Sequence, residues 1–114
     1  MRLFRKLRPS VPASDAALPE QAVLVHIAGP MHYGIGLDEI EDALIDAIER
    51  AGVGEFDGNE LAPDDATLFM YGPDADHLFA VIEPVLWRAA LPPGSYVTVR
   101  YGEPGTEERR IDLR

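Results

Sequence analysis

Hydrophobic residues recur at helical spacing in the segment that follows the first glycine-rich loop. Leu37, Ile40, Leu44 and Ile48 form one stripe, and Gly52 follows it. The pattern predicts a helix over residues 37–51 that ends at a left-handed glycine. The helix dipole favours anions in the first turns, and four acidic residues lie there: Asp38, Glu39, Glu41 and Asp42.

A second amphipathic stripe lies nearer the C-terminus and predicts a second helix. Pro73 or Asp74 is expected in its opening turn, because both residue types favour helix starts. Pro84 falls inside the helix and removes one backbone hydrogen bond, which predicts a kink or a break. The apolar positions of this stripe are Leu78, Ile82, Val85 and Ala89.

Alternating apolar and polar residues, many of them β-branched, predict strands in five further segments. These segments are residues 22–28, 53–61, 67–71, 96–101 and 107–113. Gly58 interrupts the second strand and predicts a bulge there. Residues 62–65 are predicted to form a tight turn. Pro63 fixes the backbone angle φ, and the side chains of the two aspartates can form hydrogen bonds with the nearby backbone.

The order of these elements is β-α-β-β-α-β with one more strand at the C-terminal end. This order is typical of an α+β fold, the two-layer ferredoxin-like βαββαβ sandwich, here with an extra C-terminal hairpin strand. Residues 22–114 are expected to form this single domain. Residues 1–21 are basic and rich in Pro and Ala, and are expected to form a flexible tail.

Alternation along the strands predicts which side chains face the helices and which face away from them. The expected helix-facing residues are Val23, Val25, Ile27, Leu68, Met70, Val97 and Val99. The opposite face would then show Leu24, His26, Thr67, Phe69, Tyr71, Tyr96, Thr98 and Arg100. Monomers rarely expose such an apolar and aromatic patch without use. Homodimerisation, a different protein partner and RNA stacking are the alternatives, although the RNA-binding motif is missing.

His26 is the one histidine of this predicted face. A histidine in a central strand is commonly a structural residue. With Tyr71, Tyr96 and Arg100 on the same face, it could instead line a small polar pocket that handles an anionic small molecule. No third group with a clear orienting role accompanies it, so the sequence assigns no catalytic residue.

The charge distribution limits the classes of macromolecule that the chain is expected to bind. The chain has 20 acidic and 10 basic residues, and 19 of the acids lie between residues 9 and 108. An anionic body repels phosphate backbones, which argues against nucleic acid, and attracts basic proteins. On the first helix, Asp38, Asp42, Asp46 and Glu49 share one face. Asp42 and Asp46 then belong either to a solvated surface or to a docking surface for a basic partner.

The sequence argues against several kinds of functional site. The chain has no cysteine, which excludes a disulfide framework, a thiolate zinc site and a cysteine nucleophile. The acidic segment from Glu55 to Glu60 contains oxygen ligands that suit Ca²⁺ or Mg²⁺ but lacks the full EF-hand pattern; the alternative is an edge strand protected by charges. The loop at residues 29–36 lacks the endings of a phosphate-binding loop. We therefore expect no cofactor and no metal.

The basic residues at the start of the chain are relevant to its location in the cell. Leu3, Phe4 and Leu7 lie at helical spacing among four cations, which would give only marginal membrane contact. No run approaches the ~20 apolar residues of a membrane span. No apolar segment of a secretory signal follows the basic start, so a cytoplasmic protein is expected.

Four stretches carry a resemblance to a known group of proteins. They are VGEFDGNE (53–60), YGPDAD followed by Leu78 and Phe79, IEPVL (82–86) and RYG (100–102). Over residues 22–113 the chain resembles a family of short, acidic, uncharacterised bacterial proteins. The resemblance implies a bacterial, cytoplasmic, stand-alone α+β domain and assigns no activity or site residue.

Two functional hypotheses follow from the sequence. The first is a non-catalytic protein-interaction or regulatory module, in which the acidic helix or the open sheet face binds a basic partner or a second copy. The second is a small-molecule-binding protein or small enzyme that uses His26, Tyr71, Tyr96 and Arg100. In either case the candidate surface also includes Phe69, Asp42 and Asp46.

Overall fold

The computed structural model describes residues 20–29 and 36–113. Within them, five strands and two helices follow one another in the predicted order. The strands are β1 (Gln21–Ala28), β2 (Glu55–Leu61), β3 (Asp65–Gly72), β4 (Tyr96–Arg100) and β5 (Glu108–Asp112), and the helices are α1 (Leu37–Ala51) and α2 (Ala75–Ala89). Gln21, assigned to the tail from sequence, already belongs to β1. The rest of that tail and residues 30–35 of the first loop lie outside the described residues.

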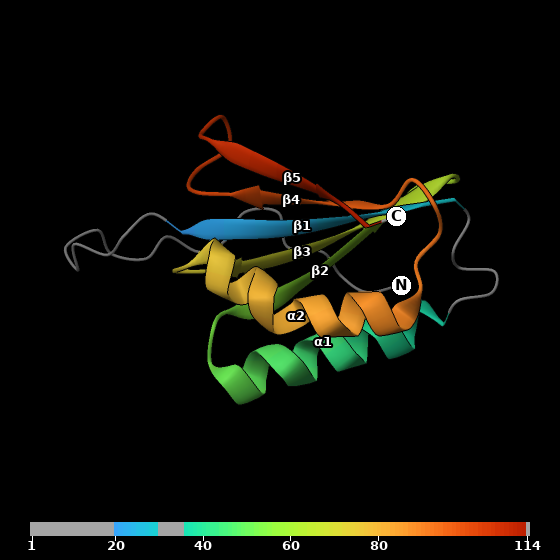
Figure 1. Cartoon of the computed structure of the whole chain (residues 1–114), viewed down its shortest axis with the longest axis horizontal. Coiled ribbons are helices and arrows are strands. Elements are labelled where there is room, and N and C mark those ends of the chain that lie inside the picture. Colours follow the sequence, from blue (N-terminus) through green and yellow to red (C-terminus); the bar gives the residue numbers. More distant parts are fainter. Residues whose placement is uncertain (1–19, 30–35, 114) are drawn as a thin grey trace.

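The five strands form one antiparallel sheet in the order β2-β3-β1-β4-β5. Both helices lie on the same face of this sheet, with α2 between α1 and the strands in the view of Figure 1. The predicted α+β class is therefore confirmed. The predicted final strand is confirmed as well, because β5 pairs with β4 from Glu108 to Asp112.

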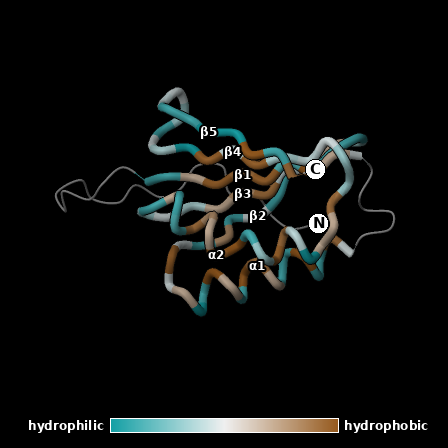
Figure 2. Tube along the Cα trace, in the orientation of Figure 1, coloured by the Kyte–Doolittle hydropathy of each residue, from teal (hydrophilic) through white to brown (hydrophobic). Residues whose placement is uncertain are grey.

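The core lies between the sheet and the helices. The seven strand residues predicted to face the helices are all fully buried, and they pack against Ile40, Leu44 and Ile48 of α1 and against Leu78 and Ile82 of α2. Figure 2 shows this arrangement as hydrophobic segments on β1 and β4, whereas β5 is mostly hydrophilic. Burial of apolar side chains on alternate strand positions thus fixes the orientation of the sheet.

The helix ends follow the predicted chemistry. Asp74 is the N-cap of α2, and its side chain accepts a hydrogen bond from the His77 backbone N–H at 3.1 Å. Gly52 ends α1 in the left-handed conformation, with φ 65°. At the end of α2 the left-handed position is taken by Ala90, with φ 53°, a conformation that costs a residue with a Cβ atom about 1–2 kcal/mol.

Of the kink or break predicted at Pro84, the break is wrong, because α2 continues through Pro84 to Ala89. Proline cannot donate the hydrogen bond that a helix expects at this position, which leaves the carbonyl of Ala80 without that donor. Both Pro84 and Ala80 are exposed. Water can therefore solvate the carbonyl, and the packing of the opposite face of α2 holds the helix together.

The predicted irregularity in β2 is confirmed. The pairing with β3 shifts between Phe56 and Asn59, and Gly58 has φ 105°. As a result, Asp57 and Asn59 are buried whereas Glu55 and Glu60 are exposed. β2 lies at the edge of the sheet with Glu55 and Glu60 exposed, as the alternative of a charge-protected edge strand predicts, whereas the buried Asp57 does not guard that edge.

Two glycines make a close backbone contact where β2 begins and β3 ends. The α-carbons of Gly54 and Gly72 face each other, and Gly54 has φ 155°. A Cβ atom added at Gly54 would collide with the carbonyl oxygen of Tyr71, and one added at Gly72 with that of Val53. The approach of these two backbone segments requires glycine at both positions.

Neither α1 nor α2 is long and apolar enough to cross a membrane.

Candidate functional site

The face of the sheet opposite the helices carries the residues that alternation placed there. All eight are half-buried: Leu24 and His26 on β1, Thr67, Phe69 and Tyr71 on β3, and Tyr96, Thr98 and Arg100 on β4. In the register of the sheet, Leu24 lies between Phe69 and Thr98, and His26 lies between Thr67 and Tyr96. We call this surface the open sheet face.

A stack of three side chains crosses the open sheet face from β1 to β5. The His26 and Tyr96 rings are stacked, with centroids 4.3 Å apart and planes at 21°. The guanidinium carbon of Arg110 lies 3.7 Å from the centroid of the Tyr96 ring, a cation–π contact. Arg110 also donates to Asp112 Oδ1 at 2.9 Å. The Tyr96 ring is thereby held between an imidazole and a guanidinium.

His26 is further fixed by a hydrogen bond and by its electrostatic surroundings. Its Nε2 lies 3.2 Å from the Thr98 hydroxyl. Burial lowers the pKa of His26 below its ordinary value of 6.5; Asp65 and Glu108 oppose this shift, and Arg110 adds to it. Because the pKa is lowered, the imidazole is neutral at pH 7.

A small cavity opens beside this stack, where β1 ends and β3 and β4 begin. Its volume is about 190 Å³, and its lining includes His26, Ala28, Asp64, Asp65, Gly94 and Tyr96. Asp64 lies in the turn between β2 and β3 and Asp65 is the first residue of β3; the Ala62 N–H closes the turn by donating to the Asp65 carbonyl at 2.9 Å. Both aspartates are exposed, so the rim of the cavity is anionic.

The four residues proposed from sequence as one pocket lie at two ends of the open sheet face. His26 and Tyr96 are in contact, whereas Tyr71 and Arg100 both pair with Ala22. Ala22 and His26 are about 13 Å apart along the strand, at about 3.3 Å per residue. The Arg100 Nε donates to the Gly102 carbonyl at 2.9 Å.

The cation beside His26 and Tyr96 is Arg110, which the sequence analysis missed. Arg110 pairs with Thr98, so it projects on the same face as His26. The alternation of the last strand was visible in the sequence. Its register against β4 was the missing information.

The acids of α1 form a separate surface. Asp42 and Asp46 are exposed, and Asp46 pairs with Arg50 at 2.9 Å. Helix α1 lies in the helical layer, away from the open sheet face (Figure 1). The two surfaces predicted from sequence therefore lie on different sides of the sheet.

A buried polar contact joins α1 to the irregular part of β2. Glu41 is 2% exposed and Asn59 is 6% exposed, and the Asn59 Nδ2 donates to Glu41 Oε2. The sequence analysis placed Glu41 among the acids of the first turns and did not foresee its burial. Within residues 20–29 and 36–113, no three His, Asp or Glu side chains gather as metal ligands.

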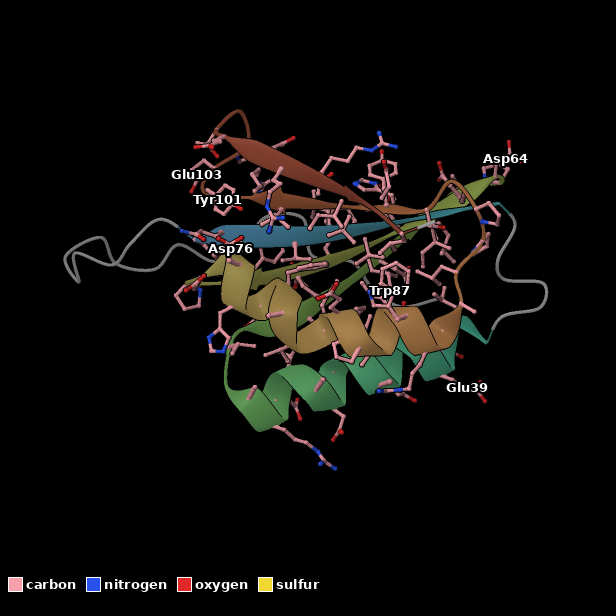
Figure 3. All side chains as sticks on the ribbon, viewed as in Figure 1. Glu39, Asp64, Asp76, Trp87, Tyr101 and Glu103 are labelled. Atoms are coloured by element: carbon pink, nitrogen blue, oxygen red, sulfur yellow. The ribbon has the colours of Figure 1, made fainter. Side chains whose placement is uncertain are left out.

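A third polar cluster ties α2 to the last hairpin. Asp76 Oδ1 accepts hydrogen bonds from the Tyr101 hydroxyl at 2.7 Å and from Arg109 Nη2 at 3.2 Å. The Tyr101 hydrogen bond and Arg109 lower the pKa of Asp76. Asp76 and Tyr101 lie together at one end of the molecule, and Asp64 lies at the opposite end (Figure 3).

Comparison with known proteins gives no relative from which a function could be inferred, so the interpretation depends on the residues described above. No family model matches the chain, and neither the curated proteins nor the solved structures include a match.

Proposed function

We propose that this chain is a non-catalytic protein-interaction module whose open sheet face binds a basic protein partner. The observation that carries the proposal is that the two faces of the sheet differ. Both described helices cover one face, and the other presents a continuous cross-strand band that includes Leu24, Tyr96 and Thr98. Half-buried apolar and aromatic side chains of this kind are typical of recognition surfaces.

Charge at the margins of this face supports a basic partner. Glu60 on β2, Asp65 on β3, and Glu108 and Asp112 on β5 are exposed. Glu60, Glu108 and Asp112 each pair with a residue of the open sheet face and therefore project on the same side. Asp65 lies two residues before Thr67 on β3, so alternation places it on that side as well. Arg110 also projects on this side, between Glu108 and Asp112, so the rim is net acidic and not uniformly so. An apolar centre with a net acidic rim favours a partner with an apolar patch and a basic rim, and it accelerates their encounter.

The topology that presents this face is part of the same proposal. We propose the ferredoxin-like βαββαβ arrangement with β5 as an added edge strand. Its support is the central position of β1 between β3 and β4, with helices following β1 and β3. A bacterial origin and a cytoplasmic location remain predictions.

The second candidate is a small-molecule site, and the cavity beside His26 and Tyr96 favours it. Two observations weigh against it. The proposed partners Tyr71 and Arg100 lie at the other end of the face. The cavity of about 190 Å³ is also smaller than the roughly 300–1,000 Å³ of pockets that enclose drug-sized ligands.

The test is affinity capture from a lysate of the source organism with three versions of the full chain as bait. The first is the wild type, the second is Leu24→Lys in the centre of the open sheet face, and the third is Leu61→Lys. Leu61 is 44% exposed at the end of β2, so it carries the same chemical change away from that centre. Thermal unfolding of each bait confirms that it is folded.

The expected result is a basic protein that the wild type and Leu61→Lys retain at low salt and Leu24→Lys does not. Retention should fall at about 1 M salt, where the screening length is about 3 Å. Equal retention by Leu24→Lys overturns the proposal. So does a wild-type chain that light scattering shows to be a dimer dissociated by Leu24→Lys, because the occupant is then a second copy.

A further inference from the structure

The cavity beside the His26–Tyr96 stack combines flat walls with negative charge. Asp64 and Asp65 supply two exposed carboxylates at its rim. The His26 ring supplies planar surface beside them; the Tyr96 ring, covered on one face by His26 and on the other by Arg110, supplies only its edge. Figure 3 shows Asp64 at the tip of the turn between β2 and β3, where its side chain is accessible from solvent.

The cations near the cavity do not neutralise it. Arg110 stacks on Tyr96 and its guanidinium is paired with Asp112. His26 carries no charge at pH 7, because burial lowers its pKa. The nearest fixed charges that line the cavity are thus those of the two aspartates, which favour a cation and disfavour phosphate or carboxylate groups.

Size restricts the occupant further. At about 190 Å³, the cavity lies below the roughly 300–1,000 Å³ that a drug-sized ligand or cofactor occupies. A single long side chain fits this scale better than a nucleotide. In the described part of the chain, His26 and the two aspartates are not placed to hold a metal ion together, so a bare metal ion is a poor match.

We propose that this cavity receives the guanidinium group of an arginine side chain presented by the protein partner. The inference rests on the proposed function and names the chemistry by which the open sheet face recognises that partner. Arginine fits better than lysine for two reasons. Its planar group can stack on the imidazole beside the edge of Tyr96, and its fork of N–H donors matches carboxylates in bidentate geometry.

The test uses N-acetyl-arginine amide as the probe, titrated into the isotopically labelled full chain and followed by NMR. Three control arms accompany it. N-acetyl-citrulline amide has the same shape without the charge, and N-acetyl-lysine amide has the charge without the plane. The variant Asp64→Asn/Asp65→Asn removes both carboxylates and retains the ability of the turn to form hydrogen bonds.

A matched variant controls for overall charge. Asp42→Asn/Asp46→Asn changes the net charge by the same amount at two exposed aspartates of α1, which lies in the helical layer. The expected result is a set of shifts at His26, Asp65 and Tyr96 with the arginine probe. Affinity should fall about tenfold or more for the Asp64/Asp65 variant and for citrulline, and should stay within about twofold of wild type for the Asp42/Asp46 variant.

Several outcomes overturn the inference. Absence of local shifts, or equal binding of citrulline, removes the charged site. Equal binding of lysine removes the assignment to guanidinium, and equal loss in both aspartate variants shows a nonspecific charge effect. This titration is independent of the lysate capture. If the probe fails while a partner is captured through Leu24, only the cavity assignment falls; if the probe binds and no partner is captured, the proposed function falls.

Discussion

Removing the amide of Asn59 should destabilise the fold far more than its small size suggests. Asn59 donates to Glu41, and both side chains are almost completely buried between α1 and β2. A hydrogen bond to a charged group contributes about 1.5–3 kcal/mol, because the desolvated carboxylate depends on its donors. For Asn59→Ala we therefore expect a loss of about 2 kcal/mol in the free energy of unfolding.

This magnitude is measurable in a domain of this size. At about 4–8 °C per kcal/mol, the melting temperature should fall by about 8–16 °C. With a urea m-value of about 2 kcal/mol/M, the midpoint should fall by about 1 M. Urea unfolding followed by circular dichroism gives both the midpoint and the slope. Glu60→Ala, an exposed neighbour on the same strand, is the control and should shift the midpoint little.

A double-mutant cycle separates the hydrogen bond from the lost volume. Glu41→Gln retains an oxygen that accepts from Asn59 but carries no charge. In that background, Asn59→Ala should cost about 1 kcal/mol less than in the wild type, because neutral hydrogen bonds contribute about 0.5–1.5 kcal/mol. A coupling below about 0.5 kcal/mol, or an Asn59→Ala variant as stable as Glu60→Ala, would refute the argument.

Three further predictions concern other contacts. Folding lowers the pKa of His26 from 6.5, so just below that pH the unfolded chain binds more protons than the folded protein. His26 therefore makes the free energy of unfolding fall as the pH drops through this window. In His26→Gln, urea midpoints measured from pH 8 to pH 5 should depend less on pH. Tyr101→Phe removes the hydroxyl that binds Asp76, so NMR titration should show the pKa of Asp76 rising toward its ordinary value; an unchanged pKa would contradict the assignment. Ala90→Gly should stabilise the protein by about 0.5–1 kcal/mol, since Ala90 has φ 53° and glycine adopts that conformation without steric cost; an unchanged or lower melting temperature would contradict it.

The elements of the fold could be predicted because they depend on local periodicity. The stripe of Leu37, Ile40, Leu44 and Ile48 identifies α1 through burial of one helix face. The alternation around Val23, Val25 and Ile27 identifies the buried side of β1. Asp74 and Gly52 marked helix ends because their preferences are local as well.

The candidate site was only partly predictable, because it depends on register between strands distant in sequence. Alternation placed His26, Tyr96 and Arg100 on one face, but only the pairing of β1 with β4 separates Arg100 from His26. Likewise, only the pairing of β5 with β4 brings Arg110 to Tyr96. The burial of Glu41 depends on Asn59, which the bulge in β2 turns toward α1. None of these contacts leaves a signal in the local pattern of hydrophobic and polar residues.

The contact between Gly54 and Gly72 has a consequence for how this sequence can diverge. The atoms that exclude a side chain at each position are backbone atoms of the other segment, so no substitution elsewhere makes room for one. Surface charges, the rim acids and even the stacked rings can change while the fold persists, but these two positions can only change together with the path of the chain. Divergent relatives should therefore be recognisable by a paired glycine at the start of β2 and the end of β3, long after the residues of the open sheet face have been replaced.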